Sequence, residues 1–321
     1  MKSKPSLIVA GEPNSVFLEI LFKSLKLKKT KRNFILICSK NLFLLQMKKL
    51  NYNYKINLIN RASINLNKLN KNKINIINID YEFKKIFDRI SDKSNKYIEN
   101  SFKLALDLLK TGKFSGLING PISKKNFLKG RYLGITEYLA KKCNKIDKVA
   151  MLIYNKTLSV SPITTHLPLK KVHKYLSKEK IINQVKLINE FYKKRFKKIP
   201  KIAVTGLNPH CESNYNASEE DKIIKPAIQF LRKKKYKVNG PFPADTIFIN
   251  DQSKNYDVII GMYHDQVLTP IKAIYGFEAI NITLGLPFVR TSPDHGPNVS
   301  MLGKNVSNPQ SLIKALEFLD K

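Results

Sequence analysis

The sequence predicts a three-layer α/β/α fold with a largely parallel sheet. Three observations support this prediction. Short apolar runs of strand length alternate with amphipathic stretches along the 321 residues. Several of these runs end in turns that contain glycine or proline. Hydrophobic residues make up 43% of the chain, which is enough to form a sizeable core.

In the first half of the chain, strands are expected where apolar residues run without interruption, and helices where they recur every three to four positions. The run over 7–10 is closed by Gly11 and precedes a helix that ends near Leu27. The later elements of this half are, in order, a strand at 33–38, an Asn- and Lys-rich surface excursion with short strands at 50–73, an amphipathic helix at 97–109 and a strand at 116–119.

The second half continues the alternation. Ser218 and the acidic residues after it are typical of a helix N-cap and first turn. The expected elements are, in order, strands at 149–154 and 158–162, a Lys-rich helix at 178–197, a strand at 201–205, a helix from 218 to about 234, strands at 257–262 and 279–284, and a helix at 309–319. Crossovers of this kind join parallel strands.

Charge dominates the composition, with 58 Lys and Arg against 24 Asp and Glu and a net charge of +34. Such an excess can bind phosphate backbones. The excess is mostly lysine on predicted helix faces and turns, so we favour a compositional origin over a nucleic-acid role, although the field would attract anionic substrates. No apolar stretch approaches the roughly 20 residues of a membrane span, and no secretory signal is evident. Three cysteines without CxxC spacing indicate a reduced, cytoplasmic setting.

Three of the five histidines follow predicted strands. His166, His210 and His264 each stand shortly after an apolar run. Ligands of open α/β sheets collect beyond the carboxyl ends of strands, and three imidazoles suit a divalent transition metal. The sequence therefore predicts a metal site, with hydrogen-bonded loop histidines as the alternative. Asp245 and Asp265 are the carboxylates expected nearest these histidines, with structural capping as their alternative role.

Further polar residues stand among apolar ones after the last of these histidines. Lys272, Asn281 and Arg290 are the most prominent. A guanidinium and an ammonium beside a metal suit a substrate that carries phosphate or carboxylate, although Lys272 could equally be a surface lysine. Glycines form neither the GxGxxG nor the GxxxxGK[ST] pattern, so a nucleotide would have to bind through a loop such as 292–296.

Seven segments stand out along the chain, at 119–124, 134–140, 164–169, 206–210, 240–248, 262–266 and 283–296. In this order they resemble segments of the 4-hydroxythreonine-4-phosphate dehydrogenases of vitamin B6 biosynthesis. The resemblance implies an isocitrate/isopropylmalate dehydrogenase-like α/β/α fold with two domains and an interdomain cleft. Residues 1–125 plus 288–321 would form the cofactor-side domain, and 126–287 the domain for metal, substrate and dimerisation. It also implies a homodimer whose active site is completed across the interface.

The resemblance further implies NAD(P)-dependent oxidation of 4-phosphohydroxy-L-threonine with a Zn, Mg, Co or Mn ion. The product would decarboxylate to 3-amino-2-oxopropyl phosphate. The implied site residues are His166, His210 and His264 for the metal; Thr136, Lys272, Asn281 and Arg290 for the substrate; Asp294, His295 and Gly296 for the dinucleotide; and Lys124, Asp245 and Asp265 as further catalytic or supporting candidates.

Departures from the family pattern keep alternatives open. The family usually has His before Thr136, where this chain has Ile135, which favours a relative acting on another phosphorylated hydroxy acid, such as a phosphorylated threonate or erythronate. The family has an acidic residue where Ser300 stands, so the choice between NAD and NADP stays open. A degenerate, non-enzymatic basic protein is the third interpretation, and the retained histidines disfavour it.

Overall fold

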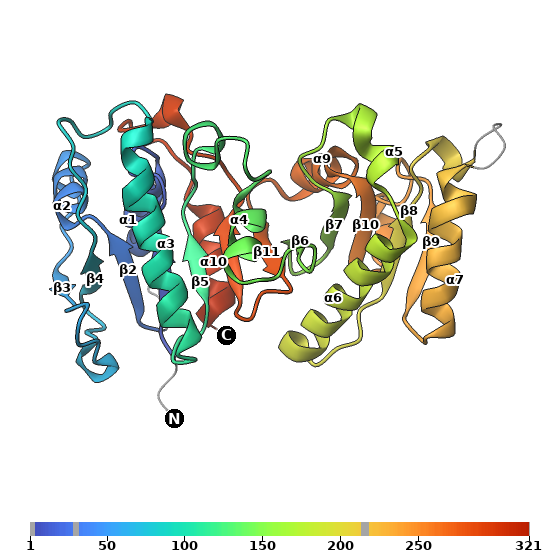
Figure 1. Ribbon diagram of the computed structural model, residues 1–321, viewed down its shortest axis with the longest axis horizontal. Coiled ribbons are helices and arrows are strands. Elements are labelled where there is room, and N and C mark those ends of the chain that lie inside the picture. The colour runs from blue at the N-terminus through green and yellow to red at the C-terminus, as the bar shows by residue number, and fades with distance from the viewer. Residues whose placement is uncertain (1–3, 28–31, 213–217, 321) are drawn as a thin grey trace. The chain divides into compact units, whose positions relative to one another are not determined.

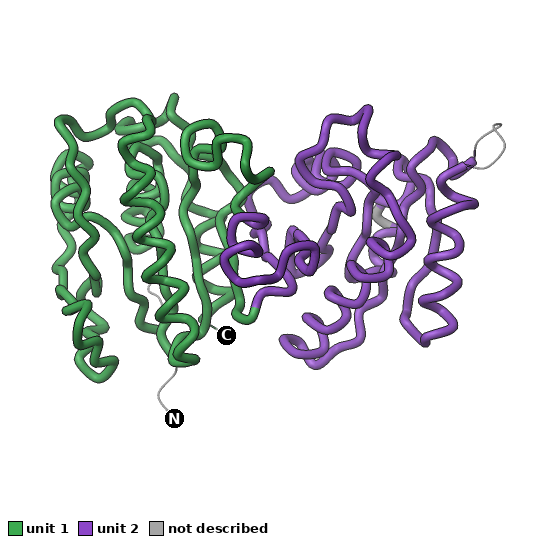
Figure 2. Tube along the Cα trace, viewed as in Figure 1, with its two compact units in different colours: residues 1–135, 287–321 green, residues 136–286 purple. Residues whose placement is uncertain are grey.

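The computed structural model describes residues 4–27, 32–212 and 218–320. By internal contacts the chain divides into two compact units, residues 1–135 with 287–321 and residues 136–286 (Figure 2). The domain boundaries expected from the sequence stay a prediction. None of the described helices combines the length and the apolar character that crossing a bilayer requires.

The first unit is built on a parallel sheet with the strand order β3-β4-β2-β1-β5-β12 (Figure 1). Its strands are β1 (Ser6–Val9), β2 (Phe34–Cys38), β3 (Ile56–Leu58), β4 (Ile74–Asn78), β5 (Leu117–Asn119) and β12 (Arg290–Pro293). The register places Ile8 of β1 opposite Leu36 and Ile118, and all three are fully buried. Burial on both faces explains why residues 7–9 and 34–38 form uninterrupted apolar runs in the sequence.

Helices cover both faces of this sheet. They are α1 (Phe17–Leu27), α2 (Lys40–Lys49), α3 (Asn95–Lys110) and α10 (Gln310–Asp320). Helix α3 contacts β1 and β2, whereas α1 contacts α2 and α10; Figure 1 shows α3 in front of the strands and α1 behind them. The predicted amphipathic face of α3 is confirmed, since Ile98, Phe102 and Ala105 are fully buried. The three layers expected from the sequence are therefore present in this unit.

The second unit has a mixed sheet with the order β11-β6-β7-β10-β8-β9. Its strands are β6 (Ala150–Tyr154), β7 (Ser159–Thr164), β8 (Ile202–Thr205), β9 (Val238–Phe242), β10 (Val258–Tyr263) and β11 (Ile280–Leu284). Four of them run parallel, but β6 is antiparallel to both β7 and β11. The expectation of a largely parallel sheet is confirmed by the other described pairings, and β6 is the exception because a short hairpin joins it directly to β7 and leaves no room for a crossover helix.

The helices of the second unit are α4 (Ile135–Lys142), α5 (Val172–Tyr175), α6 (Lys178–Phe196), α7 (Lys225–Lys233), α8 (Asn250–Ser253) and α9 (His264–Tyr275). Helix α6 contacts β6, β7 and β11, whereas α9 contacts β7 and β10. On the α9 side, Val160, Ile259 and Val267 belong to one buried apolar cluster. This core fixes the start of α9 against the ends of its neighbouring strands.

Two features of this unit bear on the site. The predicted cap is confirmed, since the Ser218 hydroxyl accepts a hydrogen bond from the Asp221 N–H at 3.3 Å. The helix does not continue regularly, however, because a π-helical turn over Glu220–Ile224 precedes α7. Helix α9, which the sequence did not predict, begins directly at the end of β10 and contains Pro270.

Candidate active site

Three neighbouring parallel strands carry the three predicted metal histidines. Strand β10 pairs with β7 on one side and with β8 on the other. The carboxyl ends of parallel strands lie at the same edge of a sheet, where ligands of α/β folds bind. His166 follows β7, His264 follows β10 directly, and His210 stands in the turn after β8. The sheet order thus explains why three histidines so far apart in sequence approach one edge.

The rings of His166 and His264 form a close pair. Their centroids are 5.7 Å apart and their planes are inclined by 38°. The register pairs Thr164 with Tyr263, and the Thr164 hydroxyl donates to the Met262 carbonyl at 2.8 Å, which holds the two strand ends together. Two imidazoles on one ion place their centroids roughly 5 Å apart, because each ring nitrogen lies about 2 Å from the metal. The pair therefore fits a shared divalent ion.

Asp265 orients one member of this pair. Oδ1 of Asp265 lies 2.6 Å from Nδ1 of His264. A carboxylate on one ring nitrogen holds the proton there and leaves Nε2 with its lone pair available. Metal-binding histidines commonly have such a carboxylate on the other ring nitrogen. The contact supports a metal-supporting role for Asp265, which the sequence proposed beside capping.

His210 is placed differently from the other two histidines. It is exposed in the turn Pro209–Cys211 and has a left-handed backbone with φ of 56°. Among residues 4–27, 32–212 and 218–320, no group of three or more His, Cys, Asp or Glu side chains is arranged to hold a metal ion. Burial raises the pKa of the neighbouring Cys211 thiol, which disfavours its thiolate form. The structure brings two of the predicted ligands together, and His210 as the third stays a prediction.

Two predicted substrate residues lie on one side of β11. Thr136, at the start of α4, is buried with its Oγ1 3.4 Å from the Thr283 hydroxyl. Asn281 and Thr283 share a face of the strand, because side chains alternate along it. The Asn281 Oδ1 is buried and accepts no hydrogen bond from any described residue. An unmatched buried amide oxygen costs about 1–3 kcal/mol, which a donor on a bound ligand would recover.

The remaining candidates of the second unit and Lys124 of the first are less constrained. Lys272 lies about two turns beyond the start of α9, roughly 12 Å along its axis, with Nζ 5.8 Å from the Phe277 ring centroid. Asp245 is exposed, and its charge contributes to the raised pKa of Cys211, so it lies near the turn that carries His210. Lys124 is exposed at the start of a π-helical turn.

Arg290 is the largest fully buried side chain of the described chain, with 0% exposure. Its Nε donates to Oδ1 of Asn119 at 2.7 Å, and Nδ2 of Asn119 donates to the Gly120 carbonyl at 2.8 Å. The sequence predicted Arg290 as a substrate cation but did not single out Asn119. A buried guanidinium needs such an acceptor, because desolvating it without hydrogen bonds is costly.

The predicted dinucleotide loop follows β12. The Asp294 N–H donates to the Ser311 hydroxyl at 2.9 Å, and Nδ1 of His295 lies 2.9 Å from the Gly296 carbonyl. The loop is tied to the start of α1, since the Val16 N–H donates to the Pro297 carbonyl at 3.2 Å. Apart from its two chain neighbours, no described residue has an atom within 4 Å of the position that a Cβ on Gly296 would take. This open backbone is compatible with a dinucleotide lying along the loop.

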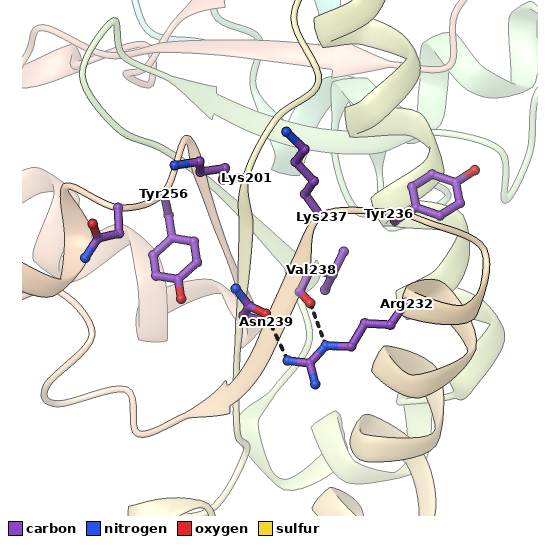
Figure 3. A pocket seen from close by; sticks show the side chains of 8 residues that line it. Lys201, Arg232, Tyr236, Lys237, Val238, Asn239 and Tyr256 are labelled. Carbon is purple, nitrogen blue, oxygen red and sulfur yellow. Dashed lines mark hydrogen bonds between the residues drawn. The ribbon is translucent and has the colours of Figure 1, made fainter.

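A separate cavity of about 440 Å³ lies in the second unit (Figure 3). It is lined by Lys201, Arg232, Tyr236, Lys237, Val238, Asn239, Asn255 and Tyr256. The Arg232 guanidinium donates to the Val238 carbonyl and to Oδ1 of Asn239, both at 2.9 Å. These residues lie around the beginnings of β8, β9 and β10, so the cavity is at the opposite edge of the sheet from the histidines. We assign it no part in the chemistry.

Two supporting residues escaped the sequence analysis. Gln266 stands in the segment 262–266 that resembles the family, but an uncharged amide gave no chemical signal. Glu220 stands where an acidic residue in the first turn of a helix is expected. Its buried carboxylate instead accepts hydrogen bonds from the N–H groups of Leu207 and Asn208. Only the three-dimensional arrangement could have identified them.

Comparison with known proteins identifies the family of the chain. The family model of the pyridoxal phosphate biosynthetic protein PdxA matches residues 30–319. The 4-hydroxythreonine-4-phosphate dehydrogenase of Sulfurihydrogenibium sp. (strain YO3AOP1) is 40% identical over 317 residues, which is 97% of this chain and 96% of that protein.

Solved structures agree in fold. The crystal structure of 4-hydroxythreonine-4-phosphate dehydrogenase from Klebsiella pneumoniae matches with a TM-score of 0.84 and 27% identity, covering 99% of this chain and 98% of that one. Isocitrate dehydrogenase from Methylococcus capsulatus matches with a TM-score of 0.52 over 99% of this chain and 84% of that one, at 9% identity, which confirms the expected fold class alone. The chain thus belongs to the 4-hydroxythreonine-4-phosphate dehydrogenase family and is an oxidoreductase.

Proposed function

We propose that this dehydrogenase oxidises 4-phosphohydroxy-L-threonine with NAD or NADP and a divalent metal ion. The names of its relatives supply the substrate. The observation that carries the metal-dependent part is the His166–His264 pair, whose ring centroids are 5.7 Å apart, with Asp265 on Nδ1 of His264. His210, from the neighbouring strand end, would be the third ligand.

The ion would supply Lewis acidity, since a bound divalent metal lowers the pKa of a hydroxyl group and stabilises negative charge on oxygen. The protein side chains would orient the substrate. The buried Oδ1 of Asn281 would accept a hydrogen bond from the substrate, and the hydroxyls of Thr136 and Thr283 lie on the same strand face. Lys272 and Arg290 would neutralise phosphate and carboxylate groups.

The proposed reaction balances as follows. The carbon that bears the secondary hydroxyl gives its hydride to the oxidised nicotinamide ring, and the hydroxyl proton leaves, so that a ketone forms. The carboxylate is then lost as CO2. The carbon that carried it keeps the electron pair of the broken bond and takes up a proton. The products are the reduced dinucleotide, CO2 and 3-amino-2-oxopropyl phosphate. The dinucleotide would lie along Asp294, His295 and Gly296.

We also propose that the active form is a homodimer whose site is completed across the interface. The resemblance to the family supports this, and within one described chain only two of the three histidines form a contact pair. Sedimentation equilibrium tests the assembly directly. A monomer that is fully active at all concentrations would contradict the proposal.

The deciding experiment measures formation of the reduced dinucleotide from 4-phosphohydroxy-L-threonine, with NAD or NADP and added metal. We expect turnover that EDTA abolishes and that is lost in His264→Ala. His173→Ala is the matched control, because His173 is exposed on α5 and is not one of the predicted ligands, and its loss should leave the rate unchanged.

Absence of turnover with both dinucleotides, from folded and metal-loaded protein, would overturn the proposal. Ile135 favours one second candidate, oxidation of a phosphorylated threonate or erythronate. It is the half-buried first residue of α4 and precedes the buried Thr136. An aliphatic side chain there cannot donate to a substrate oxygen, so these two compounds are the next substrates to assay.

A further inference from the structure

One glutamine side chain connects the ends of two strands that precede predicted metal histidines. Oε1 of Gln266 accepts hydrogen bonds from the Met262 N–H at 2.7 Å and from the Thr205 hydroxyl at 2.9 Å. Its Nε2 donates to the Gly206 carbonyl at 2.8 Å. The contacts use both the oxygen and the nitrogen of the amide, so neither an aliphatic nor an acidic side chain could reproduce them.

A buried carboxylate holds the next two peptide groups. Oε1 of Glu220 accepts from the N–H groups of Leu207 at 2.7 Å and Asn208 at 2.9 Å, and Oε2 accepts from Nδ2 of Asn208 at 2.9 Å. Burial alone would raise the pKa of Glu220, but the hydrogen bonds from Asn208 and Leu207 outweigh it and lower the pKa. The group is therefore a carboxylate at neutral pH although its residue is 0% exposed.

Gly206 permits the Glu220 carboxylate to approach this short segment closely. A Cβ at this position would lie 3.0 Å from Oε1 of Glu220 and 2.7 Å from Sγ of Cys211. Gln266 thus binds the carbonyl of residue 206, while Glu220 binds the two N–H groups that follow. His210 stands two residues beyond this fixed segment, and His264 stands two residues before Gln266.

We propose that Gln266 and Glu220 are positioning residues for metal binding. They hold the turn that carries His210 and the start of the helix that carries His264 in one arrangement. The inference rests on the proposed function, because it assumes that these histidines bind the ion. A merely structural role would change stability alone, whereas a positioning role also changes metal affinity and the spectrum of the bound ion.

The test uses the full-length protein, freed of metal by chelation and titrated with Co²⁺ while its visible absorption is followed. Gln266→Leu removes all three hydrogen bonds, and Gln266→Glu removes the donor to Gly206. Gln184→Leu is the matched control, because the Gln184 amide is also buried in this unit but donates to Ser161 and Pro162 within β7. Glu220→Gln is a milder variant in case the others fail to fold.

We expect both Gln266 variants to bind Co²⁺ about 10–100-fold more weakly and with an altered visible spectrum, as for other residues that orient metal ligands. Glu220→Gln should show a smaller loss of the same kind. Gln184→Leu should lower stability but keep the affinity and the spectrum. A folded Gln266→Leu protein with the affinity and spectrum of the unmodified protein would overturn the inference.

Hydrogen exchange of the metal-free proteins separates this inference from the proposed function. Gln266→Leu should accelerate exchange in the segment 206–211 more than elsewhere in the second unit. A uniform acceleration would indicate a purely structural role and would also overturn the inference. If the unmodified protein binds no metal at all, the proposed metal-dependent function is wrong. The positioning of His210 for metal binding is then wrong as well, even if Gln266→Leu accelerates exchange locally.

Discussion

The imidazole rings of His166 and His264 lie with their centroids 5.7 Å apart, although one follows β7 and the other follows β10. The parallel pairing of Thr164 with Tyr263 brings the two strand ends into register. The contact is therefore a consequence of sheet topology. A change that shifts this register would separate the rings.

Asp265→Asn should weaken divalent metal binding by about 10-fold or more, because the amide cannot hold the Nδ1 proton of His264 as a carboxylate does. Titration calorimetry with Zn²⁺ measures the effect. Asp251→Asn, at an exposed position on α8, is the control and should bind normally. Equal affinities of all three proteins would show that Asp265 only caps α9.

Glu12→Gln should stabilise the protein at neutral pH. The Glu12 carboxylate is buried and accepts from the Asn14 N–H and the Ser94 hydroxyl, which also lies 2.9 Å from the Ser91 carbonyl. A glutamine could accept the first bond and donate to Ser94, whose proton would then go to Ser91.

The pH dependence follows from the same group. Burial raises the pKa of Glu12, and its hydrogen bonds offset only part of the rise. The native state therefore binds this proton more tightly, and the free energy of unfolding falls as pH rises from about 4.3 through the native pKa. Urea unfolding over this range should show the advantage of Glu12→Gln growing with pH. Glu82→Gln, at an exposed position, is the control.

Asn119→Ala should lower the free energy of unfolding by about 1–3 kcal/mol, because the buried Nε of Arg290 loses its acceptor. Urea denaturation measures this loss. Asn72→Ala, at an exposed position in the same unit, should change stability by less than about 0.5 kcal/mol. A stable Asn119→Ala protein would mean that Arg290 relies on other acceptors.

Gly206→Ala should destabilise the protein by about 1–3 kcal/mol, because the new methyl group would collide with Sγ of Cys211 and Oε1 of Glu220. Thermal unfolding provides the measurement. Gly296→Ala is the comparison, since a Cβ there meets no atom within 4 Å, and its unfolding temperature should hardly change. Similar behaviour of the two variants would show that the turn after β8 can yield at low cost.

Much of the fold could be predicted because buried parallel strands are apolar on both faces. The runs that became β1, β2 and β10 needed no other signal. Helix α2 was not expected because its buried face is short, with only Leu42, Phe43, Gln46 and Met47 covered. Helix α9 was not expected because a proline interrupts it and polar residues begin it. These elements owe their form to packing rather than to local pattern.

Likewise, only some residues of the candidate site could be predicted from the sequence. Positions after strands identified the histidines, since topology places strand ends at a common edge. Gln266 and Asn119 could not be found, because an uncharged amide becomes informative only when its partners are known. Glu220 gave a misleading signal, as an acid in a first helical turn is ordinarily solvated, whereas here it turns back to Leu207.

The complete burial of Arg290 has a kinetic consequence. Water has already been removed from its guanidinium, so an arriving anion would not have to displace a hydration shell, but it could reach the group only while the surrounding side chains open. Association would then be limited by the frequency of opening, and its rate would level off as ligand concentration increases. Dissociation would be slow for the same reason, so a bound anion would have a long residence time.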